Sequence, residues 1–228
     1  MGIGPLARRA LGRHERWISE AYRRLFVDLN ALVASVREHV KAPEAILELG
    51  CGDGMVTQRL ALAFPCARVT GIDVCAQPGR LYRGERSRVR FLRTTAEELA
   101  ATEDLRYQLV IIADVLHHVP HPEWSRFLSS AAALVSEGGT LILKDWVREW
   151  TPAYLIGYLS DRFITGDRIR YPHEHAVRSL VKRTCGETSI RSEFRVSPWH
   201  CNLALVISPP PIPQLQRDTA RDVARSRA

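Results

Sequence analysis

The sequence predicts a doubly wound, Rossmann-like α/β fold with a mostly parallel seven-stranded sheet and an antiparallel C-terminal hairpin strand. Short apolar runs alternate with segments whose apolar residues recur every three or four positions, as strands and helices do. Such alternation requires parallel strands with helices on both faces of the sheet. The last two strand-like runs are joined only by Pro198-Trp199-His200, which indicates a hairpin at the sheet edge.

The predicted elements follow one another closely along the chain. Residues 14–40 carry apolar residues at helical spacing and form one or two amphipathic helices, which end before Pro43. Strands are expected at residues 45–49, 67–73, 88–93, 107–113, 139–144, 189–197 and 201–207. Helices are expected at residues 54–64, 79–84, 96–103, 122–135 and 173–184.

We divide the chain into three parts. Residues 1–44 form N-terminal helices that cover the active site, and residues 45–208 form the α/β domain. Within that domain, residues 146–172 form a long insertion with one apolar helical face, which either packs on the sheet or serves as a substrate lid. Residues 209–228 form a proline-rich exit and a mobile tail.

Length and composition fit one globular unit with a full core, because 46% of the 228 residues are apolar. No stretch is long and apolar enough to span a membrane, and the N-terminus lacks a secretory pattern. The five cysteines contain no Cys-x-x-Cys pair, which favours a reducing compartment, the cytoplasm, and argues against structural zinc or disulfides.

The formal net charge of +7 raises the alternative of a nucleic-acid partner. The excess lies near both ends of the chain and in one central cluster. That cluster comprises Arg80, Arg83, Arg86, Arg88, Arg90 and Arg93. Because charge runs are usually solvated faces, we rank nucleic acid below a small molecule as the partner.

The stretch from Ile46 to Gly54, Ile-Leu-Glu-Leu-Gly-Cys-Gly-Asp-Gly, points to a ligand site. Its glycines permit a tight turn and a close backbone approach, and the helix start that follows offers free N–H groups. The next strand ends at Asp73, where doubly wound sheets hold a ribose diol. The G-x-G-x-G spacing and the acid Glu48 suit a ligand with an ammonium or sulfonium group better than a pyrophosphate.

With these residues the chain resembles the class I S-adenosylmethionine-dependent methyltransferases, from about residue 45 to residue 145. Residues 107–119, which contain Asp-Val-Leu-His-His-Val, resemble the family's fourth-strand motif. Residues 134–143 resemble its helix, Gly-Gly turn and fifth strand. In residues 91–99, the family's adenine-binding Asp is replaced by Thr95, which offers a hydroxyl without charge.

The resemblance implies a class I methyltransferase domain over residues 45–208 and a binding site for S-adenosylmethionine, whose product is S-adenosylhomocysteine. Glu48 and the glycine loop are expected to hold the methionine end, Asp73 the ribose, and the residues around Thr95 the adenine. The expected cofactor-binding residues are Glu48, Gly50, Cys51, Gly52, Asp73, Val74, Thr95, Ala96, Glu97, Asp114 and Val115.

A histidine is the natural general base near neutral pH. His118 is the first choice, because it follows the fourth strand, whereas His117 either packs or caps a helix. Asp145 and His200 are the other catalytic candidates.

A metal site is not expected. His173 and His175 lie two residues apart and cannot share a helix face, and no carboxylate is spaced to complete a known site.

We therefore predict a methyltransferase acting on a small, apolar metabolite, with O-, N- and C-methylation left open. Two alternatives are an RNA or other nucleic-acid methyltransferase and a non-catalytic subunit that retains the cofactor fold. The expected partner is a small-molecule acceptor, without a membrane span, and a homodimer is compatible with this prediction.

Overall fold

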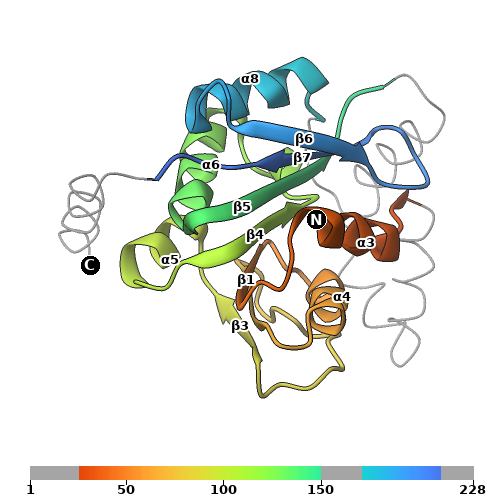
Figure 1. Ribbon diagram of the computed structural model, residues 1–228, viewed down its shortest axis with the longest axis vertical. Coiled ribbons are helices and arrows are strands. Elements are labelled where there is room, and N and C mark those ends of the chain that lie inside the picture. Colours follow the sequence, from red (N-terminus) through yellow and green to blue (C-terminus); the bar gives the residue numbers. More distant parts are fainter. Residues whose placement is uncertain (1–25, 150–170, 212–228) are drawn as a thin grey trace.

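The computed structural model describes residues 26–149 and 171–211 (Figure 1). At its centre is a seven-stranded sheet in the order β3-β2-β1-β4-β5-β7-β6. Strand β7 runs antiparallel to both of its neighbours, and the other pairs are parallel. This arrangement confirms the predicted doubly wound sheet with an antiparallel C-terminal hairpin strand. The greater part of residues 1–44, of the insertion 146–172 and of the tail 209–228 lies outside the described residues.

The strands lie close to their predicted positions. They are β1 (Ala45–Leu49), β2 (Arg68–Asp73), β3 (Val89–Arg93), β4 (Tyr107–Ala113), β5 (Val135–Trp146), β6 (Ile190–Arg195) and β7 (Asn202–Ile207). The helices are α3 (Leu29–His39), α4 (Met55–Ala63), α5 (Ala96–Thr102), α6 (Trp124–Ala133) and α8 (Glu174–Cys185). Two short 3₁₀ helices, η2 (Leu116–His118) and η3 (His121–Glu123), lie between β4 and α6.

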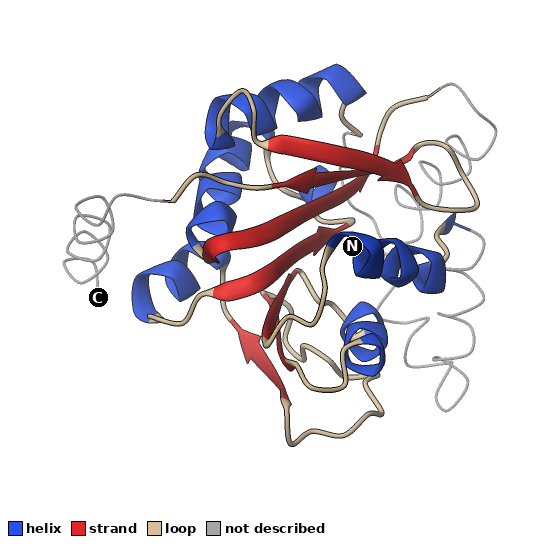
Figure 2. Ribbon diagram, viewed as in Figure 1, coloured by secondary structure: helices blue, strands red, loops and turns tan. Residues whose placement is uncertain are grey.

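Helices cover both faces of the sheet, whose strands stand between two groups of helices in Figure 2. Neighbouring residues of β1 point to opposite faces, as the pleat requires. Ile46 packs with apolar residues of α3 and α4, whereas Leu47 packs with those of α5, α6 and α8. The central strands are therefore buried on both sides, which is the reason for their almost continuous apolar sequence.

The helix predicted at residues 79–84 is wrong, because the structure has turns there. Gly79 adopts a left-handed conformation with φ +70°. Its N–H donates to the carbonyl of Gly52 at 2.9 Å, and the N–H of Leu81 donates to Asp53 O at 2.9 Å. The segment thus uses its backbone donors to support the glycine loop instead of forming a helical ladder.

The turn between β6 and β7 binds the segment that leads into α3. Ser197 O accepts the N–H of Asp28 at 2.7 Å, and the side-chain amide of Asn202 donates to Phe26 O at 2.8 Å. Asp28 in turn caps α3, because its carboxylate accepts two backbone N–H groups of the first turn. The start of α3 is therefore held against the turn between β6 and β7, which lies about 170 residues later in the sequence.

The same turn binds both flanks of the insertion. His200 Nδ1 lies 3.1 Å from Oε1 of Glu149, near the start of the insertion. Arg195 donates to Glu174 at 2.7 Å, just after it, and to the carbonyl of His200 at 3.2 Å. Three segments that are distant in sequence therefore meet at residues 195–202, which we call the hairpin anchor.

Candidate active site

The glycine loop leaves β1 and passes over the end of β2. The N–H groups of Gly50 and Cys51 donate to the carbonyl of Ile72 at 2.8 and 2.9 Å. Gly50 has φ +74°, and a Cβ added to it would lie 2.3 Å from a methyl group of Val115. Glycine is therefore required at position 50 for two reasons, the left-handed backbone and the close approach of the loop after β4.

Asp73 connects the glycine loop to the segment after β2. Its carboxylate accepts the N–H of Gly52 at 2.7 Å and the N–H of Cys75 at 2.8 Å. A carboxylate offers more acceptor positions than these two, so Asp73 can also accept from hydroxyl groups of a ligand. The next residue, Val74, is 65% exposed, which leaves apolar surface beside this acid.

Glu48 lies almost fully buried at the end of β1, next to the glycine loop. Its carboxylate accepts a hydrogen bond from the hydroxyl of Thr57 on α4. A buried acid at the base of the loop provides negative charge on the side where a cationic ligand group is expected.

Thr95 begins α5 as part of a capping box. Its hydroxyl accepts the N–H of Glu98 at 3.1 Å, while the carboxylate of Glu98 accepts the N–H of Thr95 at 3.0 Å. The N–H of Thr95, together with the hydroxyl of Thr94, which donates to the same carboxylate at 2.8 Å, holds the pKa of Glu98 below its usual value. Ala96 is buried and Glu97 is partly exposed beside it.

A sharp turn follows β4 and is held by two consecutive residues of β5. Asp114 has φ +59°, unusual for a residue with a side chain, and its N–H donates to Lys144 O at 3.0 Å. The ammonium of Lys144 lies 2.5 Å from Asp114 Oδ1, and its side chain has no exposed surface. Asp145, the next residue of β5, contacts the same turn at His117.

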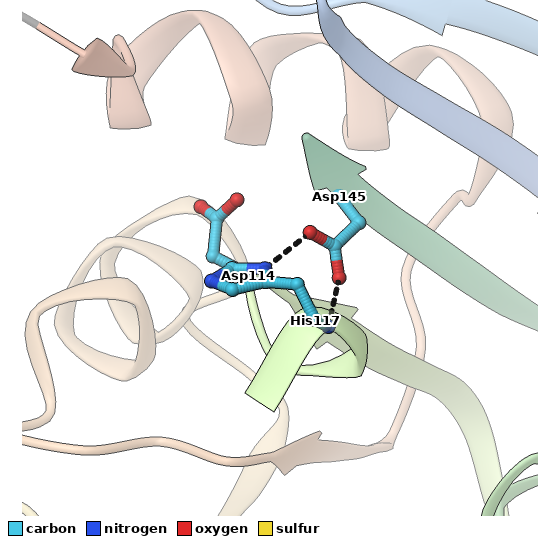
Figure 3. A group of neighbouring side chains, drawn as sticks. All are labelled: Asp114, His117 and Asp145. Atoms are coloured by element: carbon cyan, nitrogen blue, oxygen red, sulfur yellow. Dashed lines mark hydrogen bonds and ion pairs between the residues drawn. The ribbon is translucent and has the colours of Figure 1, made fainter. Parts of the chain in front are cut away.

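His117 and Asp145 form a buried pair (Figure 3). His117 Nδ1 lies 2.5 Å from Asp145 Oδ1, and the N–H of His117 donates to Oδ2 at 3.1 Å. The N–H of Trp146 also donates to Oδ1, at 2.7 Å. Burial raises the pKa of Asp145, but the His117 charge and hydrogen bond, Lys144 and the Trp146 N–H together lower it below the usual value.

Because Asp145 is ionised, its oxygens accept and Nδ1 of His117 carries the proton that lies between them. When the imidazole is neutral, the other ring nitrogen, Nε2, is the basic one. An imidazole held by a carboxylate in this way is the arrangement that general bases use. The pair can therefore take a proton from an acceptor group.

Aromatic rings continue from this pair toward the N-terminal segment. Tyr171 lies 5.1 Å from His117, measured between ring centroids, and 5.9 Å from Trp146. Phe26 lies 5.8 Å from Trp146. The ring of His118, whose side chain is exposed, lies 4.2 Å from that of His117. His117 is thus surrounded by aromatic rings, which make its environment apolar.

The comparisons with known proteins agree with this geometry. Residues 46–139 match the family model described as a methyltransferase domain. The chain is 30% identical over 174 residues to the "Ubiquinone biosynthesis O-methyltransferase" of Aromatoleum aromaticum, which covers 73% of this chain and 69% of that relative. The chain belongs to the class I S-adenosylmethionine-dependent methyltransferases.

Two further proteins give the extent of this similarity. The protein of the same name from Saccharophagus degradans is 33% identical over 143 residues, which are 60% of this methyltransferase but only 58% of that relative. The structure of the 1,6-didemethyltoxoflavin-N1-methyltransferase of Burkholderia thailandensis superposes with a TM-score of 0.61 at 21% identity. It covers 89% of this chain and 83% of that protein, and at this identity it supports the fold alone.

The methyltransferase keeps its expected cofactor-binding residues around one end of the sheet. Glu48 is the penultimate residue of β1, Asp73 ends β2, Thr95 precedes α5 and Asp114 follows β4. Carboxyl ends of parallel strands meet at one edge, where ligands of open α/β sheets bind. The left-handed Gly50, the buried acid and the exposed Val74 fit the methionine and adenine ends of the cofactor, and these assignments stay predictions.

The predicted catalytic residues are distributed differently. Asp145 lies in the buried pair, but its partner is His117, and His118 lies beside them with its side chain exposed. His200 is 72% exposed and contacts Glu149. The sequence offers no signal that separates two adjacent histidines, because their environment depends on the pairing of β4 with β5.

Three further histidines, His121, His173 and His175, lie elsewhere in the methyltransferase. His173 and His175 stack on each other at 5.4 Å, and His175 lines a pocket of about 320 Å³ between α6 and α8, together with His121. Among the described residues, potential metal-ligating side chains gather instead at Asp114, His117 and Asp145, a group that the sequence does not suggest.

Several arginines of the central cluster have structural roles. Arg88 donates to the carbonyls of Ala61, Phe64 and Ala67 at 2.6, 3.3 and 3.1 Å, so it caps the end of α4. Arg90 pairs with Glu103 at 2.6 Å. The positive charges of Arg88 and Arg90 are thus engaged by groups of the protein itself.

None of the helices within residues 26–149 and 171–211 is both long and apolar enough to cross a membrane.

Proposed function

We propose that this methyltransferase transfers a methyl group from S-adenosylmethionine to a hydroxyl group of a small, flat, apolar acceptor. The observation that carries the proposal is the His117–Asp145 pair next to a row of aromatic rings. The names of the relatives in Aromatoleum aromaticum and Saccharophagus degradans are those of O-methyltransferases, which supports oxygen over nitrogen or carbon as the acceptor atom.

Binding of the cofactor is assigned to the residues at the ends of β1, β2 and β4. Glu48 and the glycine loop hold the methionine end, Asp73 accepts from the ribose hydroxyls, and Val74 with residues 95–97 lines the adenine. Asp114 and Val115 approach from the turn after β4. When bound, S-adenosylmethionine supplies an electrophilic methyl group on a sulfonium.

The protein's own contribution is to orient the acceptor and to remove its proton. His117 Nε2 would take the proton of the acceptor hydroxyl, whose oxygen would receive the methyl group that the cofactor supplies, with S-adenosylhomocysteine as the leaving product. Asp145 stabilises the imidazolium that results and keeps the ring in place. The aromatic rings exclude water from the acceptor, which keeps the oxygen nucleophilic. His118 is the alternative base, since it lies beside His117.

An assay with isotope-labelled methyl donor tests the proposal. We expect label in the ether products of simple phenols and catechols, and S-adenosylhomocysteine in equal amount. Label found only in RNA would establish the nucleic-acid alternative. Tight binding of S-adenosylmethionine, measured by calorimetry, without transfer to any acceptor would establish a non-catalytic subunit.

A cytoplasmic location and a homodimer stay predictions. Analytical sedimentation of the purified protein tests the homodimer.

A further inference from the structure

Three side chains at the ends of β4 and β5 have the composition of a divalent-metal site. Asp114, His117 and Asp145 each offer one ligand atom, and these atoms all lie within 4.8 Å of one another. They come from the end of β4, from η2 and from β5 (Figure 3). Two carboxylates and one imidazole are a donor set that first-row metals accept.

One member of this group, Asp114, already contacts a positively charged side chain. The Lys144 ammonium lies 2.5 Å from Asp114 Oδ1, and the whole Lys144 side chain is buried. A buried ammonium needs an anionic partner. Asp114, whose side chain is 30% exposed, is that partner for Lys144, and the positive charge of Lys144 also acts on Asp145.

We propose that the Lys144 ammonium is a built-in cation that keeps a divalent metal out of a latent Asp114–His117–Asp145 site. A metal bound to Asp114 would stand close to the ammonium, and the low dielectric of this buried region strengthens their repulsion. It would also compete with the His117–Asp145 hydrogen bond. The ammonium thus supplies the local positive charge and leaves the His117–Asp145 hydrogen bond intact.

The inference does not depend on the acceptor or on catalysis, because metal binding is measured without methyl donor. Lys144→Met removes the charge and keeps an unbranched side chain that is one atom shorter. We expect this variant to bind one Co²⁺ at least tenfold more tightly than the wild type, with tetrahedral or five-coordinate bands in the visible spectrum. The protein must carry no histidine tag.

Matched variants identify the ligands. Lys182→Met removes a lysine from the surface of α8, where it pairs with Glu187 at 3.2 Å, and should bind Co²⁺ as the wild type does. Adding Asp114→Asn to Lys144→Met should abolish the tighter binding of Co²⁺, because it removes one of the proposed ligands. The exposed thiol of Cys66 is present in every variant, so it contributes an equal background.

Two results would overturn the proposal. One is Co²⁺ binding by folded Lys144→Met that is no tighter than that of the wild type. The other is found in the wild type itself: we expect neither EDTA nor added Mn²⁺ to shift its thermal unfolding midpoint. A wild-type midpoint that falls on chelation and rises with Mn²⁺ would show that the ammonium does not exclude metal, even if Lys144→Met fails to fold.

Discussion

Asp145 accepts two hydrogen bonds from His117, one from the ring at 2.5 Å and one from the backbone N–H at 3.1 Å. The carboxylate therefore fixes both the side chain and the main chain of a residue three positions past the β4 turn. Such double attachment leaves the imidazole little rotational freedom. It explains why one histidine of the adjacent pair is held rigidly in the buried site.

The first prediction separates the two histidines. His117→Asn should lower kcat by about 10²–10⁴-fold, because it removes the base, and should leave the Kd for S-adenosylmethionine within about threefold. His118→Asn should change kcat much less. Steady-state kinetics and calorimetry on both variants check this. A larger loss in His118→Asn would assign the base to His118, as the sequence alone suggests.

Acid stability should depend on Asp145, whose pKa is lowered in the folded protein. The unfolded chain binds a proton at about pH 3.9, whereas the folded protein resists protonation to a lower pH. Asp145 should therefore contribute fully to the free energy of unfolding above about pH 5. This contribution should decrease as the pH falls through the folded pKa. Urea titrations between about pH 3 and pH 6 measure this slope.

Asp145→Asn should make the free energy of unfolding depend less steeply on pH in this range. Glu137→Gln, on the surface, serves as the control. Equal slopes in wild type and Asp145→Asn would contradict the expectation.

Two left-handed glycines allow a matched test of the glycine loop. Gly50 and Gly138 have φ values of +74° and +70°, but only a Cβ at position 50 would meet another side chain, that of Val115 at 2.3 Å. Both alanine variants incur backbone strain. Gly50→Ala should lose about 1–3 kcal/mol more than Gly138→Ala in chemical denaturation, because of overpacking. It alone should also weaken cofactor binding.

Asp73→Ala should weaken the binding of S-adenosylmethionine by about ten- to hundredfold, which corresponds to about 1.5–3 kcal/mol for lost hydrogen bonds to a charged acceptor. Asp73→Asn retains an acceptor oxygen without the charge, so its Kd should lie between those of the wild type and Asp73→Ala. Since Asp73 also accepts the N–H of Gly52, the thermal midpoint is measured in parallel. An unchanged Kd in Asp73→Ala would remove the ribose role, and tight binding of NAD would contradict the cofactor assignment.

Arg88 and Arg86 distinguish structural from nucleic-acid roles of the arginine cluster. Arg88→Met loses the cap on α4 and should be destabilised by about 1–3 kcal/mol. Arg86→Met removes the same charge, but its guanidinium lies over the Tyr82 ring at 5.9 Å, so the cost should stay below about 1 kcal/mol. If the cluster bound RNA, both variants would reduce the salt dependence of binding equally.

The sequence predicts the sheet well because its central strands are buried on both faces. Ile46, Leu47 and Leu49 face two different cores, so β1 shows as an apolar run whose end coincides with the glycine loop. The strand bounds differ mainly at β5, which begins at Val135 and continues through a left-handed Gly138. A pattern of apolar residues cannot reveal a strand across such an irregular, partly exposed start.

Tertiary hydrogen bonds account for what the sequence does not predict. Residues 79–84 have helix-compatible composition, but their donors bind the carbonyls of the glycine loop. Likewise His117 and His118 are equivalent in any local pattern, and only the position of Asp145 on the neighbouring strand distinguishes them. The buried Lys144 is similar, since a lysine at a strand end usually reads as exposed.

The hairpin anchor has a consequence for protein engineering. Its residues contact Asp28 at the start of α3, Glu149 near the start of the insertion and Glu174 just after it. Swapping the insertion alone between homologous enzymes would therefore break hydrogen bonds and ion pairs at both of its ends. A chimera that takes the insertion together with residues 26–28, 173–174 and 195–202 from one parent should transfer acceptor preference, whereas a graft of the insertion alone should fold poorly.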